Sequence, residues 1–167
     1  MRMLYSRRMK LTSLVTVLLV CVMSLFLPTS AAAQSAASDA PDYSGMYSFV
    51  KDGEFMQITL EDKGAVSGFI SRYGDSSTEK GTFLDQFIKS GTANGAHVTF
   101  ATDSVHGVSY TFDGAFARGP GKTPQEDGYY ILRGTLTRNV ASADGKSTTQ
   151  NQQVEFRSFP RDADAPQ

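Results

Sequence analysis

The sequence predicts an all-β protein, a single antiparallel up-and-down barrel of about eight strands. Three observations support this fold class. Short segments of alternating apolar and polar residues recur from residue 43 to residue 160. Turn dipeptides such as Asp52-Gly53 and Asn94-Gly95 separate several of these segments. The links between segments are mostly of hairpin length, which favours strands that are neighbours in sequence and in space. A two-sheet β-sandwich is the alternative, because its strands show the same alternation.

The first half of the domain contains three clear strands and one ambiguous segment. Gly45 to Val50 comes before the first turn, the next segment carries Met56, Ile58 and Leu60 on one face, and Val66 to Tyr73 follows. The ambiguous segment, Thr82 to Lys89, fits a short amphipathic helix or the start of a strand that reaches Ala93. We favour a strand over at least its second half.

The second half of the domain has the clearest alternation. His97 to Thr102 forms one strand, and Val108 to Phe116 alternates with a period of two over nine residues, which is typical of a half-buried strand. A Gly- and Pro-rich loop, Arg118 to Gly128, leads to a strand whose apolar face starts at Tyr130. Val154 and Phe156 mark the last strand, which Pro160 ends.

The chain divides into four segments. Residues 1–33 have the three parts of a secretory signal peptide: a basic start, an apolar run from Leu11 to Leu27, and small residues at Ala31-Ala32-Ala33 for cleavage. Residues 34–42 are a linker of small residues, residues 43–160 form the β-domain, and residues 161–167 form a polar tail. We therefore expect an exported protein, either periplasmic or extracellular, with no membrane segment after cleavage.

Charge and cysteine usage exclude several functions. The formal net charge of the chain is −1. The first 33 residues, which form the expected signal, contain four basic residues and no acidic one, so the rest of the chain has a more negative net charge. Such a chain lacks the basic surface typical of nucleic-acid binding. Cys21 is the single cysteine and lies in the signal, which leaves the domain no disulfide and no thiolate ligand.

Motifs for catalysis, metals and cofactors are weak. Gly119 to Thr123 ends like a phosphate-binding loop, but Phe116 stands where the first glycine is required and no helix follows. His97 and His106 are the two histidines, too few for a metal site at close spacing. Asp103, Ser104 and His106 lie on one turn, whereas catalytic triads assemble from distant segments. The sequence therefore predicts no enzyme activity, no catalytic residue, no metal and no cofactor.

Aromatic residues are the most informative side chains. They line one face of several predicted strands, where they either pack in the core or surround an apolar pocket at the barrel mouth. We expect this interior or mouth to include Tyr47, Phe100, Tyr110, Phe112, Tyr130 and Arg157. Arg118 and Lys122, in the long loop, are further predicted binding residues, because loops on rigid scaffolds carry function.

The start and end of the domain resemble the lipocalin and avidin-like barrels. Those families have a G-x-W motif in the first strand, and in lipocalins a basic residue on or after the last strand packs over the tryptophan. Gly45-Met46-Tyr47 stands at the first position here, and Arg157 lies in the last strand. The resemblance implies an eight-stranded barrel closed by a cation over an aromatic ring. Biotin binding is not implied, since the chain has no tryptophan.

These observations favour a non-enzymatic exported barrel that binds a small apolar or amphipathic ligand. The alternative is a protein-binding module, such as a periplasmic inhibitor or an envelope scaffold, which acts through its N-terminal segment or long loop. An outer-membrane barrel is disfavoured because most segments are shorter than the ~9–11 residues that a membrane strand needs. The identity of the ligand, the oligomeric state and the filling of the barrel do not follow from the sequence.

Overall fold

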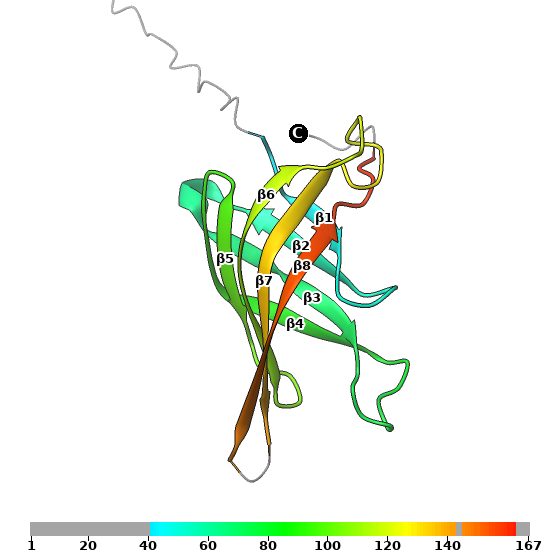
Figure 1. The fold of residues 1–167 in the computed structure, drawn as a ribbon, viewed down its shortest axis with the longest axis vertical. Helices are drawn as coiled ribbons and strands as arrows, with labels where there is room; N and C mark the ends of the chain where they lie inside the picture. The colour runs from blue at the N-terminus through cyan, green and yellow to red at the C-terminus, as the bar shows by residue number, and fades with distance from the viewer. Residues whose placement is uncertain (1–40, 143–144, 163–167) are drawn as a thin grey trace, which may run out of the picture. The chain divides into compact units, whose positions relative to one another are not determined.

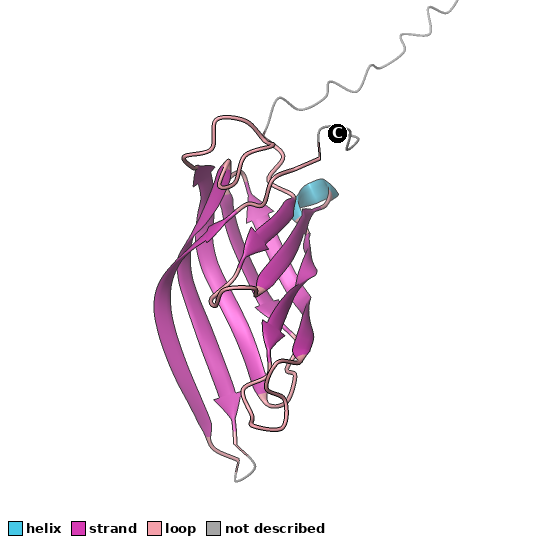
Figure 2. Cartoon of the chain, turned by 90° about the vertical axis from the view of Figure 1, so that its right-hand side faces the viewer, coloured by secondary structure: helices cyan, strands magenta, loops and turns pink. Residues whose placement is uncertain are grey.

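The computed structural model describes residues 41–142 and 145–162. The expected signal peptide (1–33) and most of the linker lie outside these residues, as does the tail beyond Asp162. The eight strands are β1 (Gly45–Ser48), β2 (Phe55–Leu60), β3 (Val66–Tyr73), β4 (Phe83–Asn94), β5 (His97–Thr102), β6 (Val108–Arg118), β7 (Tyr130–Ala141) and β8 (Ser147–Arg157). A short 3₁₀ turn, η1 (Asp62–Gly64), connects β2 and β3 (Figures 1 and 2).

The strands form one antiparallel sheet in the order β1 to β8, so each strand pairs with the next along the chain. This confirms the predicted up-and-down arrangement and excludes the two-sheet sandwich. The sheet curls until β1 meets the end of β8, where Tyr47 bridges Ser158 and the Phe159 amide donates to the Met46 carbonyl at 2.8 Å. Since β1 is four residues long and β8 is eleven, this closure occurs at one end. The result is a half-barrel.

β4 joins the two parts of the curled sheet. Its first half pairs with β3 from Phe83 to Phe87, and its second half pairs with β5 from Ile88 to Asn94. The register shifts between Ile88 and Ser90, which is a bulge that bends the strand. The segment Thr82–Lys89 is therefore almost entirely strand, which confirms the favoured interpretation and rejects a helix.

The core lies on the concave side of the sheet. Alternate residues of β6, which are Val108, Tyr110, Phe112 and Phe116, are buried there, while Thr111 and Asp113 are exposed. Gly114 interrupts this apolar row for a steric reason. It pairs with Gly134 of β7, and a Cβ atom on either glycine would come within 3 Å of the Phe112 ring. The two glycines therefore make room for this ring in the core.

β8 begins at Ser147, seven residues before Val154, the first of the two apolar residues that predict this strand from the sequence. Every residue of Ser147–Gln153 is exposed, and the segment extends with β7 beyond the closed part of the sheet (Figure 1). A strand that buries no side chain carries no apolar alternation, so the hydrophobic pattern cannot detect it.

Among the described residues, no helix is long and apolar enough to cross a membrane.

Candidate functional site at the open end of the half-barrel

The predicted aromatic residues face the interior, but most of them fill it. Phe100 contacts Phe112 with ring centroids 5.3 Å apart, and Phe112 contacts Phe156 at 6.1 Å. Phe49 links this group to Tyr110, again at 5.3 Å. These contacts are core packing, and each ring is less than a tenth exposed. The sequence left open whether Phe100 and Phe112 pack in the core or contact a ligand, and in the structure their rings pack in the core.

A second group of aromatic rings fills the end of the half-barrel where β1 meets β8. Tyr43 stacks on Phe116 at 4.7 Å and meets Tyr130 edge-on at 4.8 Å. Tyr47 packs against Phe116 at 5.8 Å, and its hydroxyl donates to the Tyr43 carbonyl at 2.6 Å. Burial raises the pKa of Tyr47 well above its usual value, and the positive charge of Arg161 opposes this only in part. The rings at this end pack against one another, and a cavity of about 360 Å³ lies beside them, lined by residues that include Tyr47, Ser158 and Arg161.

Two cations, Arg118 and Arg161, lie over the Tyr130 ring at the closed end, each 5.6 Å from its centroid, and the interpretation that assigned Arg157 to this position is wrong. Arg157 follows the inward Phe156, so the alternation of β8 puts it on the outer face, where its guanidinium lies 3.4 Å from Glu155. Arg161 instead lies over the Tyr130 ring at 5.6 Å and donates to the Ser44 carbonyl at 2.5 Å. The sequence signal for it was its position beside Pro160, a few residues beyond the last apolar residue of β8.

The predicted loop residues also lie at the closed end. The Arg118 guanidinium stacks on Tyr129 at 3.4 Å and donates to the Tyr129 carbonyl at 2.8 Å, so it holds its own loop together. Lys122 is exposed, and its backbone amide donates to the Glu126 carboxylate. The Gly128 amide donates to the Ser158 carbonyl, which ties the loop to the β1–β8 closure. Neither Arg118 nor Lys122 lines the cavity at the opposite end of the half-barrel.

A cavity of about 260 Å³ opens at the end where β1 does not reach β8. Its wall combines apolar, charged and amide side chains from the β1–β2 turn, β3, the β3–β4 loop, β6, β7 and β8. The lining residues are Val50, Lys51, Glu54, Arg72, Asp75, Tyr110, Leu136, Arg138, Gln150 and Gln152. Tyr110 is the member of the predicted set that lies here. We call this cavity the mouth.

A buried guanidinium forms the floor of the mouth. Arg72 is 2% exposed, and its Nε donates to the Gln86 side-chain oxygen at 2.5 Å. One terminal nitrogen donates to the Tyr73 carbonyl at 3.0 Å and to Asp75 Oδ2 at 2.9 Å. Gln86 in turn donates to the carbonyls of Val108 at 2.8 Å and Asp103 at 3.1 Å. The buried side-chain polar atoms of the described residues are all hydrogen-bonded, as a stable buried network requires.

Asp75 forms ion pairs with three cationic side chains at the rim of the mouth. Its Oδ2 accepts from Arg72 and from Arg138, both at 2.9 Å, and its Oδ1 lies 3.7 Å from Lys51 Nζ. Burial raises the pKa of Asp75, but the hydrogen bond from Arg138 and the three positive charges outweigh it and hold the pKa below its usual value. The carboxylate is therefore ionised at neutral pH.

The mouth carries a positive balance. Lys51, Arg72 and Arg138 contribute three positive charges against the two carboxylates of Glu54 and Asp75. Glu54 is 3% exposed and accepts the backbone amides of Tyr73 at 3.0 Å and Lys51 at 3.1 Å, so it fixes the turn. Tyr110 and Leu136 supply the apolar wall. This arrangement can hold a small molecule with an apolar part and an anionic group.

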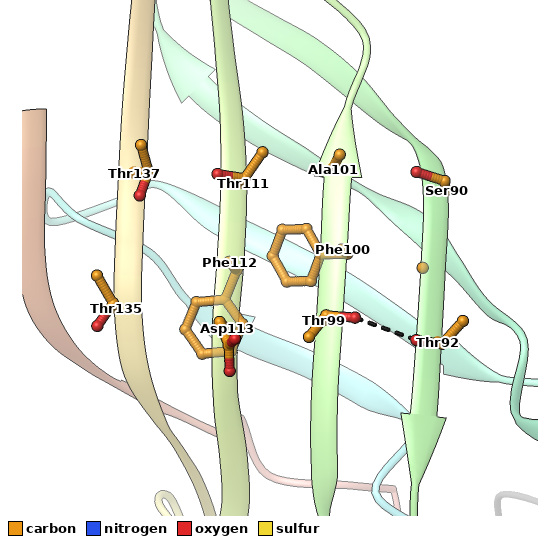
Figure 3. Close-up of a pocket in the computed structure, with 11 residues that line it drawn as sticks. Ser90, Thr92, Thr99, Phe100, Ala101, Thr111, Phe112, Asp113, Thr135 and Thr137 are labelled. Carbon is orange, nitrogen blue, oxygen red and sulfur yellow. Dashed lines mark hydrogen bonds between the residues drawn. The ribbon is translucent and has the colours of Figure 1, made fainter. Parts of the chain in front are cut away.

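A larger groove, about 470 Å³, lies on the outer face of β4 to β7 (Figure 3). Its outward side chains are mostly short hydroxyl groups, including Thr92 and Thr99, which hydrogen-bond each other at 3.1 Å. Its one charged side chain, Asp113, is paired with His97 at 2.9 Å. The groove thus lacks the buried charges of the mouth.

Among the described residues, no group of three or more His, Cys, Asp or Glu side chains could hold a metal ion.

Solved structures of avidin-type proteins share this fold. A rhizavidin–biotin complex superposes with a TM-score of 0.52 at 13% identity, covering 70% of this chain and 99% of that one. Rhizavidin by itself gives 0.53 at 13% identity, with coverage of 74% and 87%. Apo short afifavidin gives 0.51 at 16% identity, with coverage of 72% and 98%. These similarities confirm the predicted calycin-type barrel.

Comparison of the sequence with known families is less informative. No family model and no curated protein matches the chain. At this level of identity, the structural likeness concerns the arrangement of strands and not the site. The binding chemistry of the mouth therefore depends on its own residues.

Proposed function

We propose that the protein is an exported, non-enzymatic barrel that binds a small amphipathic ligand in the mouth. The observation that carries this proposal is the combination of an open cavity, an apolar wall at Tyr110 and Leu136, and an excess of cationic groups. The cavity is slightly smaller than the ~300–1,000 Å³ of typical ligand pockets, which favours a small ligand. Export to the periplasm or the cell exterior is part of the proposal and is supported by the N-terminal signal pattern.

The cationic excess favours a ligand with one anionic group, such as a carboxylate. Arg138 is the natural contact for this group because its side chain is about a third exposed, whereas Arg72 is almost fully buried. Arg138 is held by Asp75 and by the Tyr110 hydroxyl, so its guanidinium is already in place before a ligand arrives. Such preorganisation lowers the entropy cost of binding. A small ligand on this fold is also supported by the avidin-type neighbour that was solved as a complex with biotin.

Native mass spectrometry of protein purified from its own host tests the proposal directly. We expect a bound mass that is released on denaturation. Titration with short-chain carboxylates and with their uncharged amides then measures the contribution of the charge. The carboxylates should bind more tightly than the amides, because a hydrogen bond to a charged group contributes about 1.5–3 kcal/mol. Equal binding of both series, or no binding of either with no mass recovered, would reject the proposal.

A matched pair of arginine variants locates the site. Arg138→Met removes the exposed cation of the mouth and should weaken carboxylate binding about tenfold or more. Arg133→Met removes an arginine of the same strand on the outer face, where it pairs with Glu155 at 2.7 Å, and should leave binding unchanged. Thermal melting of both variants controls for folding. An equal loss of affinity in both would place the ligand elsewhere.

A further inference from the structure

The outer edge of β8 is the longest exposed strand edge among the described residues. β7 pairs with β8 along the whole of Ser147–Arg157, but β1 meets this strand only at its last residues. The Arg157 amide donates to the Ser48 hydroxyl at 2.9 Å, and Tyr47 bridges Ser158. From Ser147 to Glu155, no described strand lies beside the other edge of β8.

The direction of the backbone groups on this edge follows from two hydrogen bonds. The Ser158 amide points to β7, where it donates to the Tyr130 carbonyl at 2.9 Å, and the Arg157 amide points the other way, to Ser48. Backbone groups alternate in direction along a strand, so the odd-numbered residues of β8 present theirs to the open edge. These residues are Ser147, Thr149, Asn151, Gln153 and Glu155.

Apart from Glu155 at one limit, this edge has none of the usual protection against pairing. Natural edge strands are blunted by lysines, prolines, bulges or a covering segment. Ser147 to Val154 reads STTQNQQV, with no charge and no proline, and its register with β7 has no bulge. An edge of this kind is a template for the addition of another strand.

We propose that the occupant of this edge is β8 of a second copy, which pairs with it in antiparallel fashion. The uncharged sequence supports this choice, because self-pairing brings no like charges together. The free stretch from Ser147 to Glu155 is centred on Asn151, so a two-fold axis there pairs the largest number of residues. Asn151 then faces its own counterpart, Thr149 faces Gln153, and Ser147 faces Glu155. A two-fold contact of this type closes on itself and uses a single surface.

The dimer would also affect the mouth. Gln150 and Gln152, on the inner face of β8, line the mouth, and in the proposed register each lies opposite the other residue of the second copy. The second sheet would thus continue the wall of the cavity on its open side. This inference goes beyond the proposed ligand function and does not depend on it.

Cysteine cross-linking tests the register. In a Cys21→Ser background the chain contains no other cysteine, so an Asn151→Cys variant can form a disulfide only between copies. Hydrogen-bonded antiparallel pairs have Cα atoms about 5.5 Å apart, which is within the range for a disulfide. Mild oxidation should give a covalent dimer on non-reducing gels. Thr137→Cys, at the paired position of β7 on the same face, is the matched control and should remain monomeric.

Analytical ultracentrifugation of the full chain, purified after expression with its own N-terminal segment, tests the association itself. We expect a concentration-dependent dimer, which Asn151→Pro converts to a monomer because proline removes the outward amide without breaking a bond to β7. Circular dichroism checks that this variant remains folded. A wild-type protein that stays monomeric, or a dimer that Asn151→Pro leaves intact, overturns the proposal. Ligand affinity is read separately through Arg138→Met, so failure of one proposal does not imply failure of the other.

Discussion

At the end where β1 meets β8, the interior is filled by the rings of Tyr43, Tyr47, Phe116 and Tyr130, whereas at the opposite end it contains the guanidinium of Arg72. At the closed end the strand pairing reaches β1, and the side chains that donate to backbone carbonyls include the partly exposed Arg118 and Arg161. At the open end the side chain that does so, Gln86, is fully buried, and it donates to the Val108 and Asp103 carbonyls. The buried polar network and the cavity therefore lie together at the end that β1 leaves open.

The two ends differ in what they supply to the protein: the closed end supplies apolar packing, and the open end supplies a cavity lined by charged groups. Aromatic packing at the closed end and centre buries apolar surface, which is the main source of stability. The polar end places charges beside a cavity, and its groups are all paired, so it costs less stability than an unsatisfied site would. The following variants test this division, beginning with the largest expected effect.

Phe112→Ala tests the central core. The Phe112 ring is 2% exposed, contacts Phe100 and Phe156, and covers the Gly114–Gly134 pair. We expect a loss of about 3–5 kcal/mol in the free energy of unfolding, as for buried phenylalanines in general. Urea denaturation measures it. The control Phe87→Ala removes a ring that is 61% exposed and should change stability by about 0.5 kcal/mol or less. Similar losses in both variants would contradict the assignment of the core face.

Gln86→Met tests the polar floor of the mouth. The substitution keeps a side chain of similar length but leaves the Arg72 Nε without its acceptor, whereas the Val108 and Asp103 carbonyls keep the Val105 amide and the Thr102 hydroxyl as donors. An unsatisfied buried group costs about 1–3 kcal/mol, so we expect a loss of about this size in the free energy of unfolding. Urea denaturation again gives the value. A variant as stable as the wild type would show that the network does not stabilise the open end.

Tyr47→Phe tests the closed end and has the smallest effect at neutral pH. It removes the hydrogen bond to the Tyr43 carbonyl and should cost about 1 kcal/mol. Burial raises the folded-state pKa of Tyr47 above its unfolded value of 10.0. The wild type should therefore be fully stable below pH 10 and lose stability as the pH rises above it. Denaturation between pH 8 and pH 11 should show a shallower loss for Tyr47→Phe, and identical slopes would mean that Tyr47 is ionised or exposed in the folded state.

The sequence predicted most of the apolar strands because their alternation is strong. Val108 to Phe116 and Val66 to Tyr73 are strands at the expected positions. The polar start of β8 could not be predicted, since Ser147 to Gln153 bury nothing and show no apolar period. The mouth was missed for a related reason. Arg72, Gln86 and Asp75 lie on β3, β4 and the loop between them, and only the β3–β4 pairing brings them together.

The sequence by itself determined the all-β class, the strand order and the inward face of each apolar strand, because a two-residue period and turn residues are local properties. Tertiary structure decided which aromatic rings are core, which cations cover the closed end, and that β1 is too short to close the barrel beside β8. These features depend on how far the sheet curls and on which distant residues it brings into contact. They are long-range properties that no local pattern encodes. The acidic chain with one cysteine near its start thus folds into a half-barrel whose chemistry gathers where closure stops.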